Sequence, residues 1–234
     1  MELKLNEGYF VTGTDTGIGK TYVSAVLYKG IKKYGGGYYK PVQSGCFYKN
    51  SRLTAPDIEF VCSFNDTEYD SSMGTYFLQE EVSPHLAAEI ENTVINPERI
   101  KKDCEKFKEK YKSIIAEGAG GLYVPLVRDK FYIYDLIKML GFPVILVCST
   151  KVGSVNHSLL TVRAMNEMKI KIHGIVFNNV SEEPEHFEKD NMEIILKESR
   201  IKNYLVIRKN QKEICEEKIL KFLNIENNKG EENE

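Results

Sequence analysis

A glycine-rich run near the N-terminus constrains the fold of this chain more than any other feature. The run reads Gly13-Thr14-Asp15-Thr16-Gly17-Ile18-Gly19-Lys20-Thr21. The apolar residues before it, 9–11, predict a strand, and the amphipathic residues from 19 onward predict a helix. Glycines in such a turn let successive backbone N–H groups curl around phosphate oxygens, and the helix N-terminus adds positive potential. The sequence therefore predicts a phosphate-binding loop of the Walker A type.

The residues of this loop have distinct expected roles. Lys20 is placed to reach the terminal phosphates of a nucleoside triphosphate, and the Thr21 hydroxyl to hold magnesium. The spacing departs from the usual pattern because Thr14 stands where the first glycine is expected, with Gly13 one residue earlier. A plain glycine-rich turn with a surface lysine is the alternative, and the flanking strand and helix disfavour it. The loop residues expected to contact ATP are Gly13, Asp15, Gly17, Ile18, Gly19, Lys20 and Thr21.

The rest of the chain alternates short apolar runs with amphipathic stretches, which is typical of βαβ units and a mainly parallel sheet. Strands are predicted at residues 8–12, 37–42, 113–116, 142–148, 171–178 and 204–207. Helices are predicted at residues 19–34, 97–111, 131–140, 154–168, 185–199 and 211–223. A chain of 234 residues is long enough for one substantial core but short for two. We therefore expect a single doubly wound, P-loop-like α/β domain over residues 1–223.

Two segments do not follow this alternation. Residues 44–93 are the least regular, because polar residues and turn formers surround short possible helices, and a ligand loop is expected there. Residues 224–234 read NIENNKGEENE, which is polar, acidic and poor in apolar side chains. We expect this tail to be disordered.

Charge and cysteine usage exclude several classes of protein. The 32 basic residues nearly balance the 34 acidic ones, so the net charge of -2 predicts no nucleic-acid or membrane partner. The five cysteines are odd in number and form no C-x-x-C motif, which argues against a disulfide framework and against a zinc site. No apolar run has the length of a membrane span and no signal peptide precedes the first strand. The expected location is the cytoplasm.

A second lysine stands at the end of the second predicted strand, in Lys40-Pro41-Val42-Gln43-Ser44-Gly45. Pro41 keeps Lys40 extended at that strand end, and ligands of doubly wound sheets bind at the carboxyl ends of the strands. Lys40 would add positive charge beside the phosphate loop, which suits a second anionic reactant. A solvated lysine is the alternative, and the following Ser44 favours the functional role.

Two carboxylates are candidate magnesium ligands. Glu117 ends an apolar run and precedes the glycines of Gly118-Ala119-Gly120-Gly121, so it can hold magnesium opposite Thr21 while the glycines admit substrate close to the backbone. A strand-terminal turn with a solvated glutamate is the alternative. Asp57 follows Ala55-Pro56, where spacing alone favours a plain helix N-cap.

A further helix start is expected at Gly153-Ser154-Val155-Asn156, after the 142–148 strand. Backbone N–H groups exposed there can receive a carboxylate. His157 in this segment and His85 after Ser83-Pro84 are more typical of helix starts than of general bases.

The motifs GTDTGIGKT, KPVQSG, SPH, EGAGGL and VGSVNHSLLT together resemble those of dethiobiotin synthetase, in their order and approximate spacing. The likeness extends from about residue 9 to about residue 180. It implies a reaction in which 7,8-diaminopelargonate takes up CO2 as a carbamate, ATP phosphorylates the carbamate, and the second amine closes a ureido ring. It also implies a homodimer whose substrate site spans two subunits.

The resemblance assigns roles to individual residues. It places magnesium on Thr21, Asp57 and Glu117, and this is what raises Asp57 above a plain N-cap. It places the carbamate near Thr16, Lys40 and Ser44, and adenine near Asn178. The substrate carboxylate falls on the partner's backbone at the segment Gly153, Ser154, Val155 and Asn156. Residues 205–210 lack the glycine and proline that the family usually has beside the base, so the base contacts there are left open.

Two other functions share a related P-loop domain. An amidoligase of the cobyrinate diamide type usually carries an additional glutaminase domain, for which this chain has no room. A partitioning or septum-positioning ATPase needs an amphipathic membrane-binding tail or a basic DNA-binding face. The acidic C-terminus and the slightly negative net charge disfavour it.

Overall fold

The computed structural model describes residues 8–211 and 214–225. These residues form a seven-stranded sheet in the order β11-β10-β9-β1-β6-β2-β5, and every neighbouring pair is parallel. The strands are β1 (Gly8–Gly13), β2 (Gly36–Gln43), β5 (Gly74–Phe77), β6 (Ser113–Gly121), β9 (Val144–Cys148), β10 (Ile172–Val180) and β11 (Tyr204–Arg208). The predicted single doubly wound α/β fold is confirmed.

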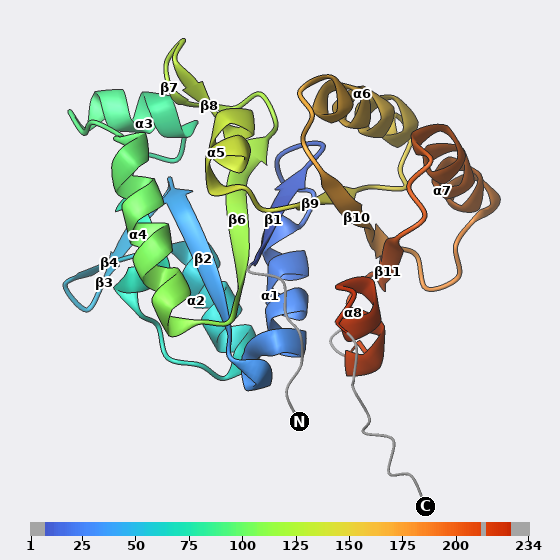
Figure 1. The fold of residues 1–234 in the computed structure, drawn as a ribbon, viewed down its shortest axis with the longest axis horizontal. Helices are drawn as coiled ribbons and strands as arrows, with labels where there is room; N and C mark the ends of the chain where they lie inside the picture. The colour runs from blue at the N-terminus through green and yellow to red at the C-terminus, as the bar shows by residue number, and fades with distance from the viewer. Residues whose placement is uncertain (1–7, 212–213, 226–234) are drawn as a thin grey trace, which may run out of the picture.

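Helices flank this sheet (Figure 1). On one face α1 packs beside α2 and α8, and on the other α4 packs beside α5, while α6 packs against α7. The helices are α1 (Lys20–Ile31), α2 (Pro56–Asn65), α3 (Pro84–Ile90), α4 (Pro97–Lys110), α5 (Ile133–Leu140), α6 (Ser154–Glu167), α7 (His186–Ser199) and α8 (Glu216–Phe222). Because both faces are covered, the central strands are apolar without alternation, and every residue of β1 and β9 is buried. Within the described ranges, no helix is long and apolar enough to cross a bilayer.

All six predicted strands are present, and most of their ends lie close to the prediction. The largest difference is β6, which was predicted to end before Glu117 but continues through the glycine run to Gly121. The predicted helix at 19–34 divides into α1 and a short 3-10 helix, η1 (Lys32–Tyr34). The helix predicted at 211–223 is shorter, because α8 begins at Glu216, and residues 212–213 lie outside the described part of the chain.

The region predicted as a ligand loop, residues 44–93, is largely regular structure. It contains a hairpin of β3 (Phe47–Lys49) and β4 (Arg52–Thr54), then α2, η2 (Ser71–Met73), the edge strand β5 and α3. A second hairpin joins β7 (Pro125–Val127) to β8 (Phe131–Tyr132), the latter taken from the start of the helix predicted at 131–140. The region is thus more regular than its sequence pattern indicated, because its strands and helices are short, and whether it contacts a ligand stays a prediction.

The packed domain extends slightly past its predicted end. Ile225 is 5% exposed and belongs to the hydrophobic core, although residue 225 was assigned to the tail. The remainder of the predicted disordered tail, 226–234, lies outside the described residues.

Candidate nucleotide-binding and catalytic site

The candidate site forms where three strands of the sheet end side by side. β6 lies between β1 and β2, and Gly13 of β1 is in register with Gly121 of β6. Lys40 near the end of β2 and Glu117 in β6 therefore come from neighbouring strands, and α2 brings Asp57 to the same place. This edge is the one at which parallel α/β sheets bind ligands.

Lys40 is the centre of a buried ionic cluster. Its Nζ lies 2.6 Å from Asp57 Oδ2 and 2.8 Å from Glu117 Oε1, and it donates to the Gly118 carbonyl at 3.1 Å. The Lys40 side chain is 3% exposed and that of Glu117 1%, whereas that of Asp57 is 25% exposed. The three ammonium protons thus have three acceptors, which excludes the alternative of a solvated surface lysine.

The two carboxylates keep this lysine charged. Burial by itself would lower the pKa of Lys40, but Glu117 and Asp57 outweigh it and hold the pKa above its ordinary value. Burial acts to raise the pKa of Asp57, and the adjacent Lys40 ammonium more than offsets it, so this pKa lies below its usual value. The cluster is therefore a buried cation between carboxylates, with one of those carboxylates open to solvent.

Glu117 accepts hydrogen bonds at both of its oxygens. The Thr21 hydroxyl donates to Oε1 at 2.9 Å, on the same oxygen that contacts Lys40, and the Tyr38 hydroxyl donates to Oε2 at 2.9 Å. Thr21 and Glu117, predicted to lie on opposite sides of a magnesium ion, are in direct contact here, and the burial of Glu117 excludes the solvated-glutamate alternative. Tyr38 was not predicted. A signal existed, because side chains two residues apart on a strand share a face, and Tyr38 is two residues before Lys40.

The phosphate loop has the conformation that its glycines allow. Gly17 and Gly19 have φ values of 71° and 91°, in the left-handed region. A Cβ added to Gly19 would clash with Asn178 Nδ2, and Asn178 Nδ2 donates to the Ile18 carbonyl at 2.9 Å. Asn178 is thus brought against the loop, and its contact with adenine stays a prediction.

Lys20 folds back onto the same loop, and its Nζ donates to the Asp15 carbonyl at 2.9 Å. Burial and then the nearby Lys40 charge lower the pKa of Lys20 to about 8. An anion received here would restore the stability of the ammonium form, because opposite charge favours ionisation. The Asp15 carboxylate accepts from the backbone N–H of Thr16 at 2.7 Å and shapes the turn.

The two hydroxyls predicted to position the carbamate, those of Thr16 and Ser44, differ in exposure and in their neighbours. Thr16 is exposed, and its Oγ1 lies 3.7 Å from where a Cβ of Gly120 would be, so it faces the β6 glycine run. Ser44 follows β2 and is half-buried. Its carbonyl accepts from Gln43 Nε2 at 2.9 Å, and among the described residues its hydroxyl makes no hydrogen bond to the Lys40 cluster.

Among the described residues, no hydrogen bond or ion pair joins this cluster to the segment Gly153, Ser154, Val155 and Asn156. It begins α6, with Gly153 at a φ of 90° as the N-cap. Glu188 of α7 holds the preceding loop, since its Oε1 accepts from the Thr150 hydroxyl at 2.8 Å. A groove of about 570 Å³ adjoins this helix start.

The oxygen groups around Thr21 suit magnesium. Thr21, Asp57 and Glu117 provide one hydroxyl and two carboxylates, and magnesium binds through one or two carboxylates with waters and phosphates completing its shell. Within the described ranges no group of three or more His, Cys, Asp or Glu side chains could hold a metal by itself. These donors fit a magnesium ion whose shell is completed by nucleotide phosphates and water.

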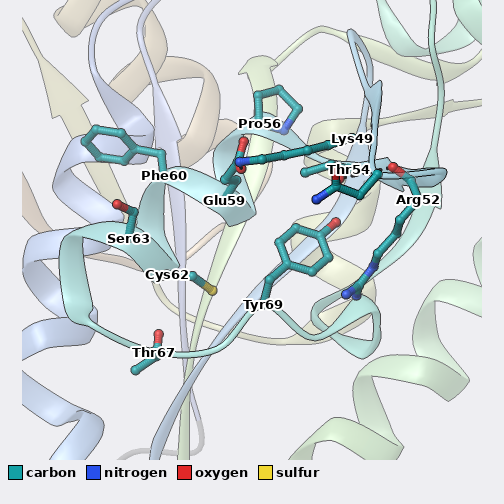
Figure 2. Close-up of a pocket in the computed structure, with 11 residues that line it drawn as sticks. Lys49, Arg52, Thr54, Pro56, Glu59, Phe60, Cys62, Ser63, Thr67 and Tyr69 are labelled. Atoms are coloured by element: carbon teal, nitrogen blue, oxygen red, sulfur yellow. Dashed lines mark hydrogen bonds and ion pairs between the residues drawn. The ribbon is translucent and has the colours of Figure 1, made fainter.

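A larger groove, of about 790 Å³, lies beside the β3–β4 hairpin and α2 (Figure 2). Its charged groups already have partners, because Lys49 pairs with Glu59 and the Arg52 guanidinium lies 4.3 Å from the ring centroid of Tyr69. On α2, Glu59 lines this groove whereas Asp57 contacts Lys40. The groove is therefore separate from the Lys40 cluster.

Comparisons with known proteins bear on the family and the fold. Residues 7–212 match the family described as AAA domain. An ATP-dependent dethiobiotin synthetase of Fusobacterium nucleatum is 56% identical over 92% of this chain and 98% of its own length, and one of Anoxybacillus flavithermus is 38% identical over 81% and 86%. Among solved structures, a ParA family ATPase from Chlorobium tepidum superposes with a TM-score of 0.56 at 14% identity, covering 93% of this chain and 91% of its own. The last likeness shows the fold alone.

Proposed function

The chain belongs to the ATP-dependent dethiobiotin synthetase family, and we propose that its Lys40 cluster and phosphate loop together close the ureido ring of dethiobiotin. The proposed substrates are 7,8-diaminopelargonate, CO2 and ATP. The observation that carries the proposal is the buried contact of Lys40 with Glu117 and Asp57 beside Thr21. It concentrates cationic and anionic groups where a triphosphate and a second anion must meet.

The chemistry proceeds in three steps. One amine of the substrate attacks CO2 and loses a proton, which gives a carbamate. A carbamate oxygen then attacks the γ-phosphorus of ATP, ADP leaves, and a carbamic-phosphoric anhydride forms. The second amine attacks the carbamate carbon, phosphate leaves with the bonding electrons, and loss of a proton completes the ring. The last step is largely a proximity effect.

Each residue of the site has a proposed task. Lys20 binds the terminal phosphates, and Lys40 binds the carbamate and the phosphoryl group in transfer. Thr16 and Ser44 orient the carbamate. Thr21, Asp57 and Glu117 would hold magnesium, which supplies charge neutralisation to the triphosphate when bound.

Lys40 must exchange a contact to reach the carbamate, because its three protons have acceptors in the protein. Asp57 is the contact that can be exchanged, since its side chain is 25% exposed and that of Glu117 only 1%. Breaking its contact with Lys40 costs Asp57 little free energy, because water or a cation can take the place of the ammonium. Glu117 is surrounded by protein and has no such replacement. The carbamate would then replace one carboxylate oxygen of Asp57 on Lys40.

ATP cleavage measured with and without diaminopelargonate and bicarbonate tests the function. We expect ADP release to require both compounds and to equal dethiobiotin formation one for one. A switch ATPase of the partitioning type would hydrolyse ATP without either compound, and this outcome would exclude the proposed synthetase activity. An amidoligase would instead respond to an amide-forming substrate with ammonia or glutamine.

We also propose that the active form is a homodimer, in which the helix start at Gly153 to Asn156 receives the substrate carboxylate of the partner's site. The groove beside this helix start supports the proposal, because its apolar side chains are unusually exposed: Val152 is 92% exposed, and Leu160 and Phe187 are also open to solvent. Such surfaces are typical of interfaces.

We also propose a cytoplasmic location, which the five free cysteines support because disulfides are rare in that compartment.

Sedimentation equilibrium with parallel activity measurements tests the dimer. We expect a stable dimer, and replacing Val152 and Leu160 together with aspartate should give a folded monomer with greatly reduced turnover, because charge is strongly disfavoured in a buried interface. A control with aspartate at Val94, an exposed apolar residue away from this groove, should remain a dimer. A fully active monomer of the parent chain would rule the proposal out.

A further inference from the structure

The two oxygens of the Glu117 carboxylate have different surroundings. Oε1 accepts from Thr21 at 2.9 Å and from Lys40 at 2.8 Å, so it lies toward the phosphate loop. Oε2 accepts from the Tyr38 hydroxyl at 2.9 Å. The carboxylate is therefore held between the loop on one side and a phenol on the other.

Tyr38 is built into the sheet as a fixed donor. Its side chain is fully buried in β2, on the strand face that it shares with Lys40. A tyrosine hydroxyl is protonated at neutral pH, and the one from Tyr38 lies 2.9 Å from Glu117 Oε2. A protonated phenol can donate only one hydrogen bond, and here that bond goes to Glu117 Oε2.

We propose that Tyr38 is a positioning residue, which occupies Glu117 Oε2 so that the carboxylate presents Oε1 alone to Thr21, Lys40 and the nucleotide-bound cation. This inference rests on the magnesium role proposed above for Glu117. It adds a determinant of cation selectivity. Magnesium is small and is bound through single carboxylate oxygens, whereas calcium accepts both oxygens of one carboxylate.

Removing the phenol hydroxyl should relax this selectivity. In Tyr38→Phe, Glu117 Oε2 would be buried without a donor, a condition that costs free energy, and the carboxylate would turn to bring both oxygens toward the loop side. Calcium should then bind better relative to magnesium. The sheet should be preserved, because only one oxygen atom is lost and the ring still fills its place.

β2 offers a matched control in the next residue. Tyr39 is also fully buried, and its hydroxyl lies 2.5 Å from Thr75 Oγ1 instead of Glu117. Tyr39→Phe removes the same atom from the same strand on the opposite face. A general effect of losing a buried tyrosine hydroxyl would appear in both variants, whereas an effect through Glu117 would appear only in Tyr38→Phe.

The experiment measures Mg²⁺ and Ca²⁺ binding by calorimetry to the full chain saturated with a non-hydrolysable ATP analogue, after a thermal melt has shown that each variant is folded. We expect Tyr38→Phe to reduce the preference for Mg²⁺ over Ca²⁺ by roughly tenfold, the change expected from one hydrogen bond to a charged group. Tyr39→Phe should keep the parental preference. An unchanged preference in Tyr38→Phe, or an equal change in both variants, would overturn the inference.

A double variant separates this inference from the function on which it rests. If Tyr38 acts through Glu117, Tyr38→Phe should have no further effect on cation preference in a Glu117→Gln background. A further effect there would overturn the inference. Parental metal binding in Glu117→Gln alone would remove the proposed magnesium role and the inference together, whereas altered binding in that variant with an unchanged Tyr38→Phe would overturn the inference alone.

Discussion

Replacing Lys40 with alanine should lower kcat by about a thousandfold, the upper range for losing one preorganised charge-stabilising donor. The Kd for ATP should rise much less, because Lys20 and the loop backbone are the groups proposed to hold the triphosphate. The physical reason is the position of the Lys40 ammonium between two carboxylates, beside the proposed carbamate site. In its absence the negative charges of Asp57 and Glu117 would repel an incoming anion, whereas in the parent these carboxylates hold the Lys40 ammonium toward it. Single-turnover kinetics and equilibrium ATP binding measure the two quantities separately.

The interpretation depends on a folded variant and a neutral control. Circular dichroism and thermal unfolding show whether the variant folds, because Lys40→Ala leaves Glu117 buried with Thr21 and Tyr38 as its remaining side-chain donors. Lys33→Ala is the control, since Lys33 is a largely exposed lysine that pairs with Glu216. Equal losses of nucleotide affinity and turnover in Lys40→Ala would make Lys40 a general phosphate-binding residue instead.

The parts of the site that could be predicted from the sequence are local. The phosphate loop needs only a strand, a glycine-rich turn and a helix in succession, and all three are contiguous between Gly8 and Ile31. The parallel strands could be predicted because sheets covered on both faces need continuous apolar runs. β5 could not be predicted, because it has four residues, begins with glycine and lies at the sheet edge, so it contains no continuous apolar run.

The contacts between distant elements could not be predicted from spacing. Asp57 at the start of α2 looked like an N-cap, and its contact with Lys40 requires α2 to pack against the end of β2. Only the family resemblance pointed to its role. The two tyrosines of β2 show part of the same limit. Strand alternation puts Tyr38 on the face of Lys40, but the contact with Glu117 also requires β2 to pair with β6, which the spacing does not give.

Replacing Asp57 with Asn or Glu117 with Gln should raise the magnesium concentration needed for half-maximal turnover and slow the reaction. Each change removes an anionic oxygen from the proposed magnesium site while keeping side-chain volume. A hydrogen bond or contact involving a charged group contributes about 1.5–3 kcal/mol, which corresponds to a roughly 10- to 100-fold effect. Turnover measured over a magnesium titration, with total ATP held constant and free magnesium calculated, gives both parameters.

The two variants should differ in the size of their effect on the magnesium requirement and the rate, and the burial of each side chain predicts which effect is larger. The Asp57 side chain is 25% exposed, so water can replace the lost contacts and the effect should lie near tenfold. Glu117 is 1% exposed and accepts from Thr21, Tyr38 and Lys40, and a glutamine amide nitrogen would face a donor whichever way it turned. Its effect should therefore approach a hundredfold.

Glu59→Gln, on the same helix as Asp57, is the control, because Glu59 pairs with Lys49 at the separate groove. Magnesium titrations of Asp57→Asn and Glu117→Gln that overlay the parent curve would show that neither carboxylate holds the metal.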